Sequence, residues 1–220
     1  MKKLMKLFLV AMFVCSPLRA EMLNLMVYGD SLSSGYKIGA KNSFANQLET
    51  ALQGKGYPVT VVNYSQAGAT SADGVHRLKG ALAKKVDGVL LALGANDMLR
   101  HIDIETTKKN LQKIISAFKE KQIPVLLIGM EATMQHPPEY RDAFRQMYVD
   151  LAMENGLLWY PFFMQGLWAD DGTQISSAYF LEDNMHPSVQ GVSVMVKHMV
   201  PAVEQFMAED IADVTFRKEP

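Results

Sequence analysis

Four short polar blocks of the sequence carry side chains whose types suit nucleophilic chemistry. They read GDSLS at residues 29–33, NYSQAG at 63–68, GAND at 94–97 and DNMHP at 183–187. A serine hydroxyl is a weak nucleophile until a neighbouring base takes its proton. A histidine can be that base when a carboxylate fixes its ring, and Asp183 precedes His186 by three residues. Ser31, His186 and Asp183 are therefore a candidate nucleophile, base and orienting acid.

The same chemistry needs hydrogen-bond donors for the negative oxygen that forms on an attacked carbonyl. One such donor is typically worth about 3 kcal/mol of transition-state stabilisation. Gly68 offers a backbone N–H that no side chain obstructs, Asn96 offers a side-chain amide, and Ser31 offers its own N–H. We therefore interpret Ser31, Gly68 and Asn96 as a candidate oxyanion hole.

Each of these residues, taken alone, has a purely structural explanation. A serine that follows an aspartate can cap a helix, and Asp183 can do the same while His186 is incidental. Gly68 suits a turn, and Asn96 suits a helix N-cap. These alternatives stay open for the single residues, so the argument depends on whether the fold brings the blocks together.

Apolar segments that alternate with amphipathic helices predict how the blocks are positioned. We expect strands at residues 23–28, 59–62, 86–93, 125–130 and 157–160. Helices are expected from an N-cap at Ser43 to Gly54, and over residues 72–84, 106–121, 140–155 and 188–207, with a loop at 165–184. This alternation predicts a five-stranded parallel sheet that is covered on both faces. Ligands bind such sheets at the carboxyl ends of the strands, where the first three blocks begin.

The four blocks in this order resemble the SGNH (GDSL-type) hydrolase family. Its four landmarks match Ser31, Gly68, Asn96 and His186, and its GxND and DxxH patterns are kept at residues 94–97 and 183–186. The resemblance implies a flavodoxin-like three-layer α/β/α sandwich. It also implies serine-dependent ester hydrolysis by Ser31, Asp183 and His186, with neither a metal nor another cofactor.

Longer stretches resemble one subgroup of that family, the bacterial periplasmic acyl-esterases of the thioesterase/protease/lysophospholipase type, often labelled arylesterases. The stretches are GDSLSSGY at 29–36, VVN at 61–63, GANDMLR at 94–100 and YPFF at 160–163. The subgroup often has glycine where this chain has Ala95, a departure expected to stiffen the loop more than to alter the chemistry. The implied substrates are small acyl esters and thioesters, such as lysophospholipids, acyl thioesters and aryl esters, cleaved through an acyl-enzyme.

Two other functions remain open at this point. The same catalytic residues could serve a carbohydrate O-acetylesterase with a small acyl pocket, or the chain could be a flavodoxin-like binding module without activity. For an acyl-chain groove we expect apolar lining residues from the loops around the blocks, since methionine can repack around varied shapes. The candidates are Met98, Leu99, Met134, Pro138, Tyr140 and Met185. The alternative is that these side chains fill the core, because the chain has 15 methionines.

Composition narrows the function classes further. The chain has 220 residues, of which 49% are hydrophobic and 20% charged, which is typical of a globular domain rather than a disordered chain or coiled coil. A net charge of −1 gives no sign of a nucleic-acid partner. A single cysteine excludes a disulfide scaffold or a Cys-rich metal site. The phosphate-binding glycine motifs and HExxH are absent from the sequence.

The first 20 residues have the pattern of a secretory signal peptide. Lysines 2, 3 and 6 precede an apolar run at residues 7–14, and Ser16, Pro17 and Ala20 follow it. The run is too short to span a bilayer, which needs about 20 apolar residues, so we expect no membrane anchor after cleavage. Residues 21–220 then form a single periplasmic or secreted domain with 18 basic and 23 acidic residues, and without Cys15. The alternative is that residues 1–20 are an N-terminal helix of the domain.

Overall fold

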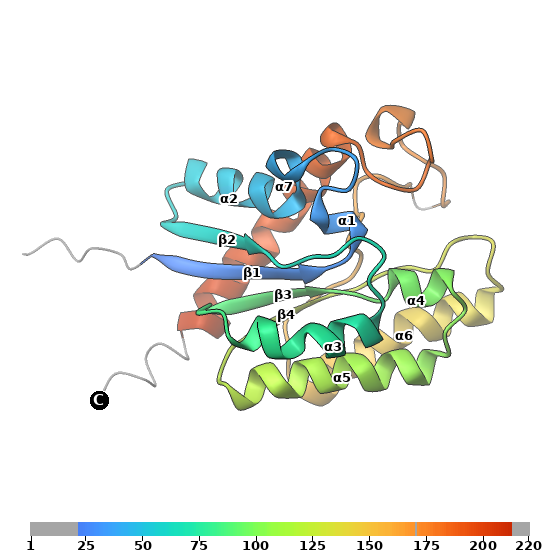
Figure 1. Cartoon of the computed structure of the whole chain (residues 1–220). Helices are drawn as coiled ribbons and strands as arrows, with labels where there is room; N and C mark the ends of the chain where they lie inside the picture. The colour runs from blue at the N-terminus through green and yellow to red at the C-terminus, as the bar shows by residue number, and fades with distance from the viewer. Residues whose placement is uncertain (1–21, 170, 213–220) are drawn as a thin grey trace, which may run out of the picture.

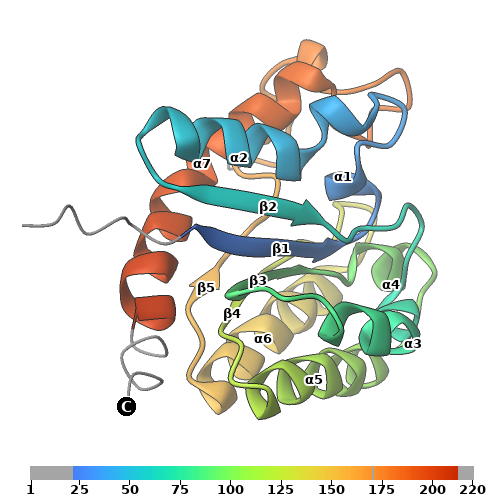
Figure 2. The ribbon, with the colours of Figure 1, turned by 60° about the vertical axis from the view of Figure 1, so that its left-hand side comes forward.

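Five parallel strands form one central sheet. The computed structural model describes residues 22–169 and 171–212, so the predicted signal peptide at 1–20 lies outside the described residues. The sheet order is β2-β1-β3-β4-β5 (Figure 1, Figure 2). The strands are β1 (Leu23–Gly29), β2 (Val59–Asn63), β3 (Gly88–Ala92), β4 (Val125–Ile128) and β5 (Trp159–Tyr160). All neighbours pair in parallel, as the sequence predicts.

Helices cover both faces of this sheet. In Figure 1, α2 lies above the sheet, α7 packs against α2 and runs down behind the strands, and α3, α5 and α6 lie below. The helices are α1 (Ser31–Ser34), α2 (Phe44–Gly54), α3 (Ser71–Leu82), α4 (Ala95–Leu99), α5 (Ile104–Glu120), α6 (Pro138–Asn155) and α7 (Val189–Phe206). Short 3-10 turns occur at Ala40–Asn42 and Ser177–Tyr179, and a π-helical turn at Met207–Ile211 follows α7. The predicted three-layer α/β/α sandwich is confirmed.

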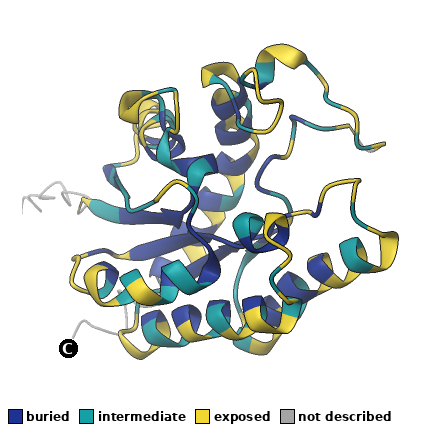
Figure 3. Ribbon diagram, turned by 45° about the vertical axis from the view of Figure 1, so that its right-hand side comes forward, coloured by how far each residue is buried: buried dark blue, intermediate teal, exposed yellow. Residues whose placement is uncertain are grey.

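The buried strands explain why the sheet needs two helical layers. Every residue of β3 and β4 is buried, and so are the last five residues of β1 (Figure 3). Continuous apolar burial of this kind is typical of parallel strands packed on both faces. None of the helices in the described part of the chain is long and apolar enough to cross a membrane.

Local capping signals set most helix starts. Ser43 accepts a hydrogen bond from Asn46 N and begins α2, as predicted. Thr70 and Asp73 form a reciprocal capping box that begins α3 at Ser71, one residue before the predicted start. The start predicted at residue 140 was wrong by two residues, because Pro138 occupies the first turn of α6, where its missing N–H costs nothing.

Two helices were not predicted from the sequence. These are α1 and α4, of four and five residues, which are too short for a 3.6-residue hydrophobic period to appear. Both follow strands directly, α1 after β1 and α4 after β3. Because β2 lies on one side of β1 and β3 on the other, the order in which strands are added to the sheet reverses at the junction of β1 and β3. Such a switch point, at the carboxyl ends of the strands, is where open parallel sheets bind ligands.

Candidate active site

Ser31 stands at the start of α1, immediately beyond β1. Asp30 caps this helix, since its Oδ1 accepts a hydrogen bond from Leu32 N at 3.0 Å. Asp30 is fully buried, whereas Ser31 is half-buried at the edge of the sheet. The buried cap therefore fixes the turn and leaves the Ser31 hydroxyl on the accessible side.

His186 reaches Ser31 from a segment 155 residues further along the chain. Because β5 lies three strands away from β1, residues 161–188 must return across the sheet edge before α7 packs against α2. A tight turn in this return segment carries the histidine, with Leu181 N donating to His186 O at 2.8 Å and Phe180 bridged to Pro187. This path explains why a long irregular segment precedes the last helix, as the sequence predicts.

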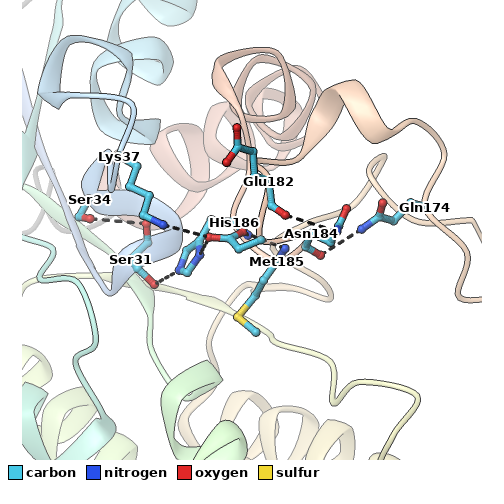
Figure 4. Close-up of polar contacts among 9 residues, drawn as sticks. Ser31, Ser34, Lys37, Gln174, Glu182, Asn184, Met185 and His186 are labelled. Carbon is cyan, nitrogen blue, oxygen red and sulfur yellow. Dashed lines mark hydrogen bonds and ion pairs between the residues drawn. The ribbon is translucent and has the colours of Figure 1, made fainter.

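The side chains of Ser31, His186 and Asp183 form one hydrogen-bonded chain (Figure 4). His186 Nε2 lies 3.0 Å from Ser31 Oγ, and His186 Nδ1 lies 3.0 Å from Asp183 Oδ2. The other carboxylate oxygen, Oδ1, accepts from the backbone N–H groups of His186 at 2.9 Å and Met185 at 3.1 Å. The carboxylate thus holds both the ring and the backbone of the histidine.

The environment of Asp183 favours its ionised form. The backbone N–H of His186 is the largest cause that lowers the pKa of Asp183 to about 2, and the His186 ring and Met185 N–H act in the same direction. The alternative role of Asp183 as a helix N-cap is wrong, because Ser188 caps α7 by accepting from Gly191 N at 3.2 Å. The carboxylate is therefore available, as an anion, to the imidazole.

The three candidate oxyanion donors lie in one neighbourhood. Asn96 Nδ2 donates to Ala69 O at 3.1 Å, beside Gly68, and to Asp30 Oδ2 at 3.3 Å, beside Ser31. Among the hydrogen bonds of the described residues, none uses the N–H of Ser31 or of Gly68 as donor. The Asn96 amide therefore joins the turns that carry the two free N–H groups.

Backbone conformation at two glycines supports this arrangement. Gly68 has φ +77°, and its carbonyl accepts from Arg100 Nη2 at 2.8 Å, which fixes the peptide plane at one side of the residue. Gly94, the N-cap of α4, has φ +123°, and a Cβ there would lie 2.1 Å from the Tyr148 hydroxyl. Since Gly94 takes the cap position, the alternative that Asn96 is an N-cap is wrong. Asn96 is the second residue of α4, and its amide donates to Ala69 O and Asp30 Oδ2 in the neighbouring turns.

Two buried aspartates hold the turns around the site. Asp97 Oδ2 accepts from Ser71 N at 2.7 Å, and Asp97 Oδ1 accepts from the hydroxyls of Ser71 and Thr107. Asp97 therefore ties α4 to the first turns of α3 and α5. Asp30 differs, because its complete burial raises its pKa to about 7, with Asp97 adding to the rise and the hydrogen bonds from Leu32 and Asn96 opposing it.

The raised pKa of Asp30 makes stability depend on pH. The unfolded chain releases the Asp30 proton above the ordinary pKa of 3.8, whereas the folded protein keeps that proton up to about pH 7. The contribution of Asp30 to the free energy of unfolding is therefore complete below about pH 4, and it is lost as the pH rises through about 7. Asparagine does not titrate. Urea unfolding is therefore expected to show that Asp30→Asn gains stability relative to the wild type between pH 4 and 8, on the order of 4 kcal/mol.

A matched control separates this effect from the general pH dependence of the domain. Asp171 is exposed, and its pKa is lowered, chiefly by the Thr173 hydroxyl and then by Thr173 N–H. Asp171→Asn is therefore expected to differ from the wild type by a constant amount over the same pH range. Parallel stability curves for Asp30→Asn and the wild type would contradict the assignment for Asp30.

The predicted lining residues separate into two groups. Leu99, Met134 and Met185 expose 40%, 59% and 43% of their surface, and all three lie on segments that follow strands. Met98 is only 4% exposed and belongs to the core. The interpretation of Met98 as a groove residue is therefore corrected, because its side chain packs inward from α4.

Pro138 and Tyr140 lie in the first turn of α6. Pro138 is exposed, while the Tyr140 ring is half-buried between His136, at a ring-centroid distance of 4.7 Å, and Phe144, at 6.0 Å. Met134 Sδ accepts from Arg141 Nη1, so this loop is anchored to α6. The structure places both residues on the loop side of the sheet.

The sequence patterns do not predict several residues that lie near the site. Arg100 fixes the Gly68 carbonyl, and Gln174 Nε2 donates to Asn184 O at 3.0 Å, in the turn that carries His186. Tyr36 and Lys37 lie against His186 and Asp183. Tyr36 ends the GDSLSSGY stretch, so the sequence resemblance includes this residue, but it does not predict that the Tyr36 ring contacts His186.

The geometry agrees with comparisons to known proteins. The GDSL-like Lipase/Acylhydrolase family matches residues 27–194, which include Ser31, Asn96 and His186. The chain belongs to this family. The acylhydrolase is 30% identical to an arylesterase of Vibrio mimicus, over 93% of this chain and 96% of that protein. It is 28% identical to the thioesterase 1/protease 1/lysophospholipase L1 of Escherichia coli, over 84% of this chain and 86% of that protein.

A solved structure supports the same assignment for the acylhydrolase. The crystal structure of TesA superposes with a TM-score of 0.76 at 28% identity, covering 83% of this chain and 98% of that one. The resemblance to the SGNH (GDSL-type) hydrolases is thus confirmed, and with it an enzyme that hydrolyses esters by a serine mechanism. The interpretation as a binding module without activity is wrong.

Proposed function

We propose that the acylhydrolase cleaves small esters and thioesters with apolar acyl chains, through an acyl-enzyme on Ser31. The observation that carries this proposal is the hydrogen-bonded chain from Ser31 Oγ through His186 to Asp183. It combines a nucleophile, a base within proton-transfer reach, and an anion that orients the base. Acyl transfer is the chemistry that needs all three groups beside free N–H donors.

The proposed reaction has two stages. His186 Nε2 takes the proton of Ser31 as Oγ attacks the carbonyl carbon, and Asp183 stabilises the imidazolium that forms. The imidazolium then protonates the leaving alcohol or thiol as its bond to the acyl carbon breaks. Water, deprotonated by His186, attacks the acyl-enzyme in the same way, which releases the carboxylic acid and restores the Ser31 hydroxyl.

The oxyanion is proposed to bind the N–H groups of Ser31 and Gly68 together with Asn96 Nδ2. The two bonds of the Asn96 amide differ in length, 3.1 Å to Ala69 O and 3.3 Å to Asp30 Oδ2. The longer one is the weaker hydrogen bond, so it is the one that an oxyanion would share or replace. The shorter one would keep the amide oriented.

Two observations support an apolar acyl group over acetate. Leu99 at the end of α4, and Met134 and Met185 in the segments after β4 and β5, expose apolar surface on the side of the sheet where Ser31 lies, and flexible methionines suit acyl chains of varied shape. The names of the similar proteins point the same way, since one is an arylesterase and another a thioesterase and lysophospholipase. Lysophospholipids, acyl thioesters and aryl esters are therefore the substrate classes that we propose.

A chain-length series tests this substrate class. We expect kcat/KM to rise at least about tenfold from p-nitrophenyl acetate to p-nitrophenyl octanoate, because each buried CH₂ contributes about 0.8 kcal/mol of transfer free energy. Palmitoyl-CoA and a lysophospholipid should also be hydrolysed. A preference for acetate, together with release of acetate from acetylated sugars, would contradict the proposal and favour the carbohydrate O-acetylesterase.

We also propose that residues 1–20 are a signal peptide and that the enzyme acts in the periplasm or outside the cell. The support is the sequence order of basic, apolar and small residues described above. Cleavage after Ala20 leaves Glu21 as the first residue. N-terminal sequencing of protein recovered from the cell envelope or medium tests this, and an intact Met1 on active exported enzyme would contradict it.

A further inference from the structure

The turn after α1 brings an aromatic ring and a cation against the His186–Asp183 pair. The Tyr36 ring centroid lies 4.6 Å from that of His186, with 47° between the ring planes. Lys37 Nζ lies 3.7 Å from Asp183 Oδ2, the oxygen that His186 Nδ1 contacts (Figure 4). The proposed mechanism uses neither residue.

This turn is held by its own backbone. The N–H groups of Ile38 and Gly39 both donate to Gly35 O, at 3.2 and 2.9 Å. Lys37 has φ +58°, an uncommon conformation for a residue with a side chain. Such backbone persists where the surrounding structure holds it, and it occurs often at active sites. Tyr36 and Lys37 therefore project from a defined turn rather than from a freely moving loop.

The turn also adds a direct contact between the stretch that carries Ser31 and the His186–Asp183 pair, besides the packing of α7 against α2 that follows His186 in the chain. Asp183 and Leu181 hold the histidine within its own segment, but these contacts do not fix that segment relative to Ser31. Tyr36 and Lys37 belong to the same stretch of chain as Ser31, five and six residues after it. Their contacts therefore fix the imidazole and its carboxylate relative to the nucleophile.

We propose that Tyr36 and Lys37 are positioning residues for the reaction, a role that rests on the function proposed above. The Tyr36 ring limits rotation of the imidazole, so that Nε2 stays directed at Ser31 Oγ. Lys37 binds the Oδ2 side of Asp183 and places a positive charge close to the imidazolium that forms during catalysis. The first effect raises kcat, and the second sets where activity declines at low pH.

The charges around the imidazole determine the direction of the Lys37 effect. In the described part of the chain, Asp183, the Tyr36 ring and the Ser31 hydroxyl contact the His186 ring, Lys37 lies against Asp183, and Asp30 is buried beside Ser31. A nearby cation disfavours a second positive charge on the imidazole and weakens the pull of the Asp183 anion. Loss of the Lys37 charge should therefore move the acid limb of the kcat/KM profile to higher pH.

Kinetics of Tyr36 variants on p-nitrophenyl acetate test the first effect, since this short ester needs no acyl groove. We expect Tyr36→Ala to lower kcat about tenfold with KM changed less than twofold, because a misdirected base lowers only the chemical step. Tyr36→Phe keeps the ring and should restore kcat to within about twofold of the wild type. Tyr57, which is 36% exposed where Tyr36 is 37% exposed, provides a matched control in Tyr57→Ala. An unchanged kcat in folded Tyr36→Ala overturns the role of Tyr36.

A charge series at position 37 tests the second effect. Relative to the wild type, Lys37→Arg keeps the charge and should leave the acid limb of the kcat/KM profile in place. Lys37→Gln should move this limb up by about 0.3 pH unit, and Lys37→Glu, which reverses the charge, by about twice as much. These shifts are small because solvent and salt partly screen exposed charges. The shifts should shrink in 1 M salt, and the exposed Lys84→Gln should cause none. An acid limb that does not shift with the charge at position 37 overturns the role of Lys37.

The Ser31→Ala variant distinguishes a failure of this inference from a failure of the proposed function. If Ser31→Ala also remained active, the proposed function itself would be wrong, whereas an inactive Ser31→Ala confines the failure to this inference.

Discussion

Ser31→Ala is expected to lower kcat/KM for ester hydrolysis by about 10⁴- to 10⁶-fold, the range seen when a serine nucleophile is removed. The variant loses the hydroxyl oxygen that His186 Nε2 contacts, so no acyl-enzyme can form on this residue. Its fold should be unchanged, because the helix cap at this turn belongs to Asp30 and not to the Ser31 side chain. Steady-state kinetics on p-nitrophenyl octanoate, with the melting temperature measured in parallel, test this.

A serine elsewhere on the surface provides the control for this variant. Ser193 is exposed on α7, and Ser193→Ala should retain full activity. Residual activity of more than a few per cent in purified Ser31→Ala would mean that another group attacks the ester. The proposed mechanism would then be wrong even though the family assignment would stand.

The second large effect is expected at His186. His186→Ala removes the base, and the loss in kcat/KM should be of the same order as for Ser31→Ala, about 10⁴-fold or more. Because the two side chains act as one unit, the double variant should be no slower than either single variant. Kinetics of the three variants at one pH measure this non-additivity.

Another exposed histidine separates the catalytic effect from a general one. His76 lies on the exposed side of α3, and His76→Ala should leave kcat/KM unchanged. If the losses of Ser31→Ala and His186→Ala multiplied in the double variant, the two residues would act independently. That result would contradict the hydrogen-bonded chain as the source of activity.

Much of this arrangement could be predicted from the sequence because its signals are local. Leu48 and Leu52 fall four residues apart after Ser43, and all three are buried in or beside α2 as that spacing requires. The β-branched and leucine-rich strands determine a parallel sheet, and a parallel sheet determines where its loops gather. Position at the carboxyl ends of strands therefore predicts that the blocks of Ser31 and Asn96 belong to the site.

The contacts between distant segments could not be predicted in the same way. Periodicity does not report that Asn96 Nδ2 bridges Ala69 and Asp30, or that Tyr36 lies against His186, since such contacts depend on how loops fold over the sheet edge. Met98 illustrates the converse error. Its apolar type suits a groove as well as a core, and only the direction of α4 decides that it packs inward.

The central claim is that Ser31, activated by His186, is the nucleophile. Covalent labelling of the folded enzyme with a fluorophosphonate, followed by mass spectrometry of its peptides, tests this most directly. We predict one label per chain, on Ser31, which abolishes activity and does not form in His186→Ala. A label on any other residue that abolishes activity, or full labelling of His186→Ala at the wild-type rate, would contradict the claim.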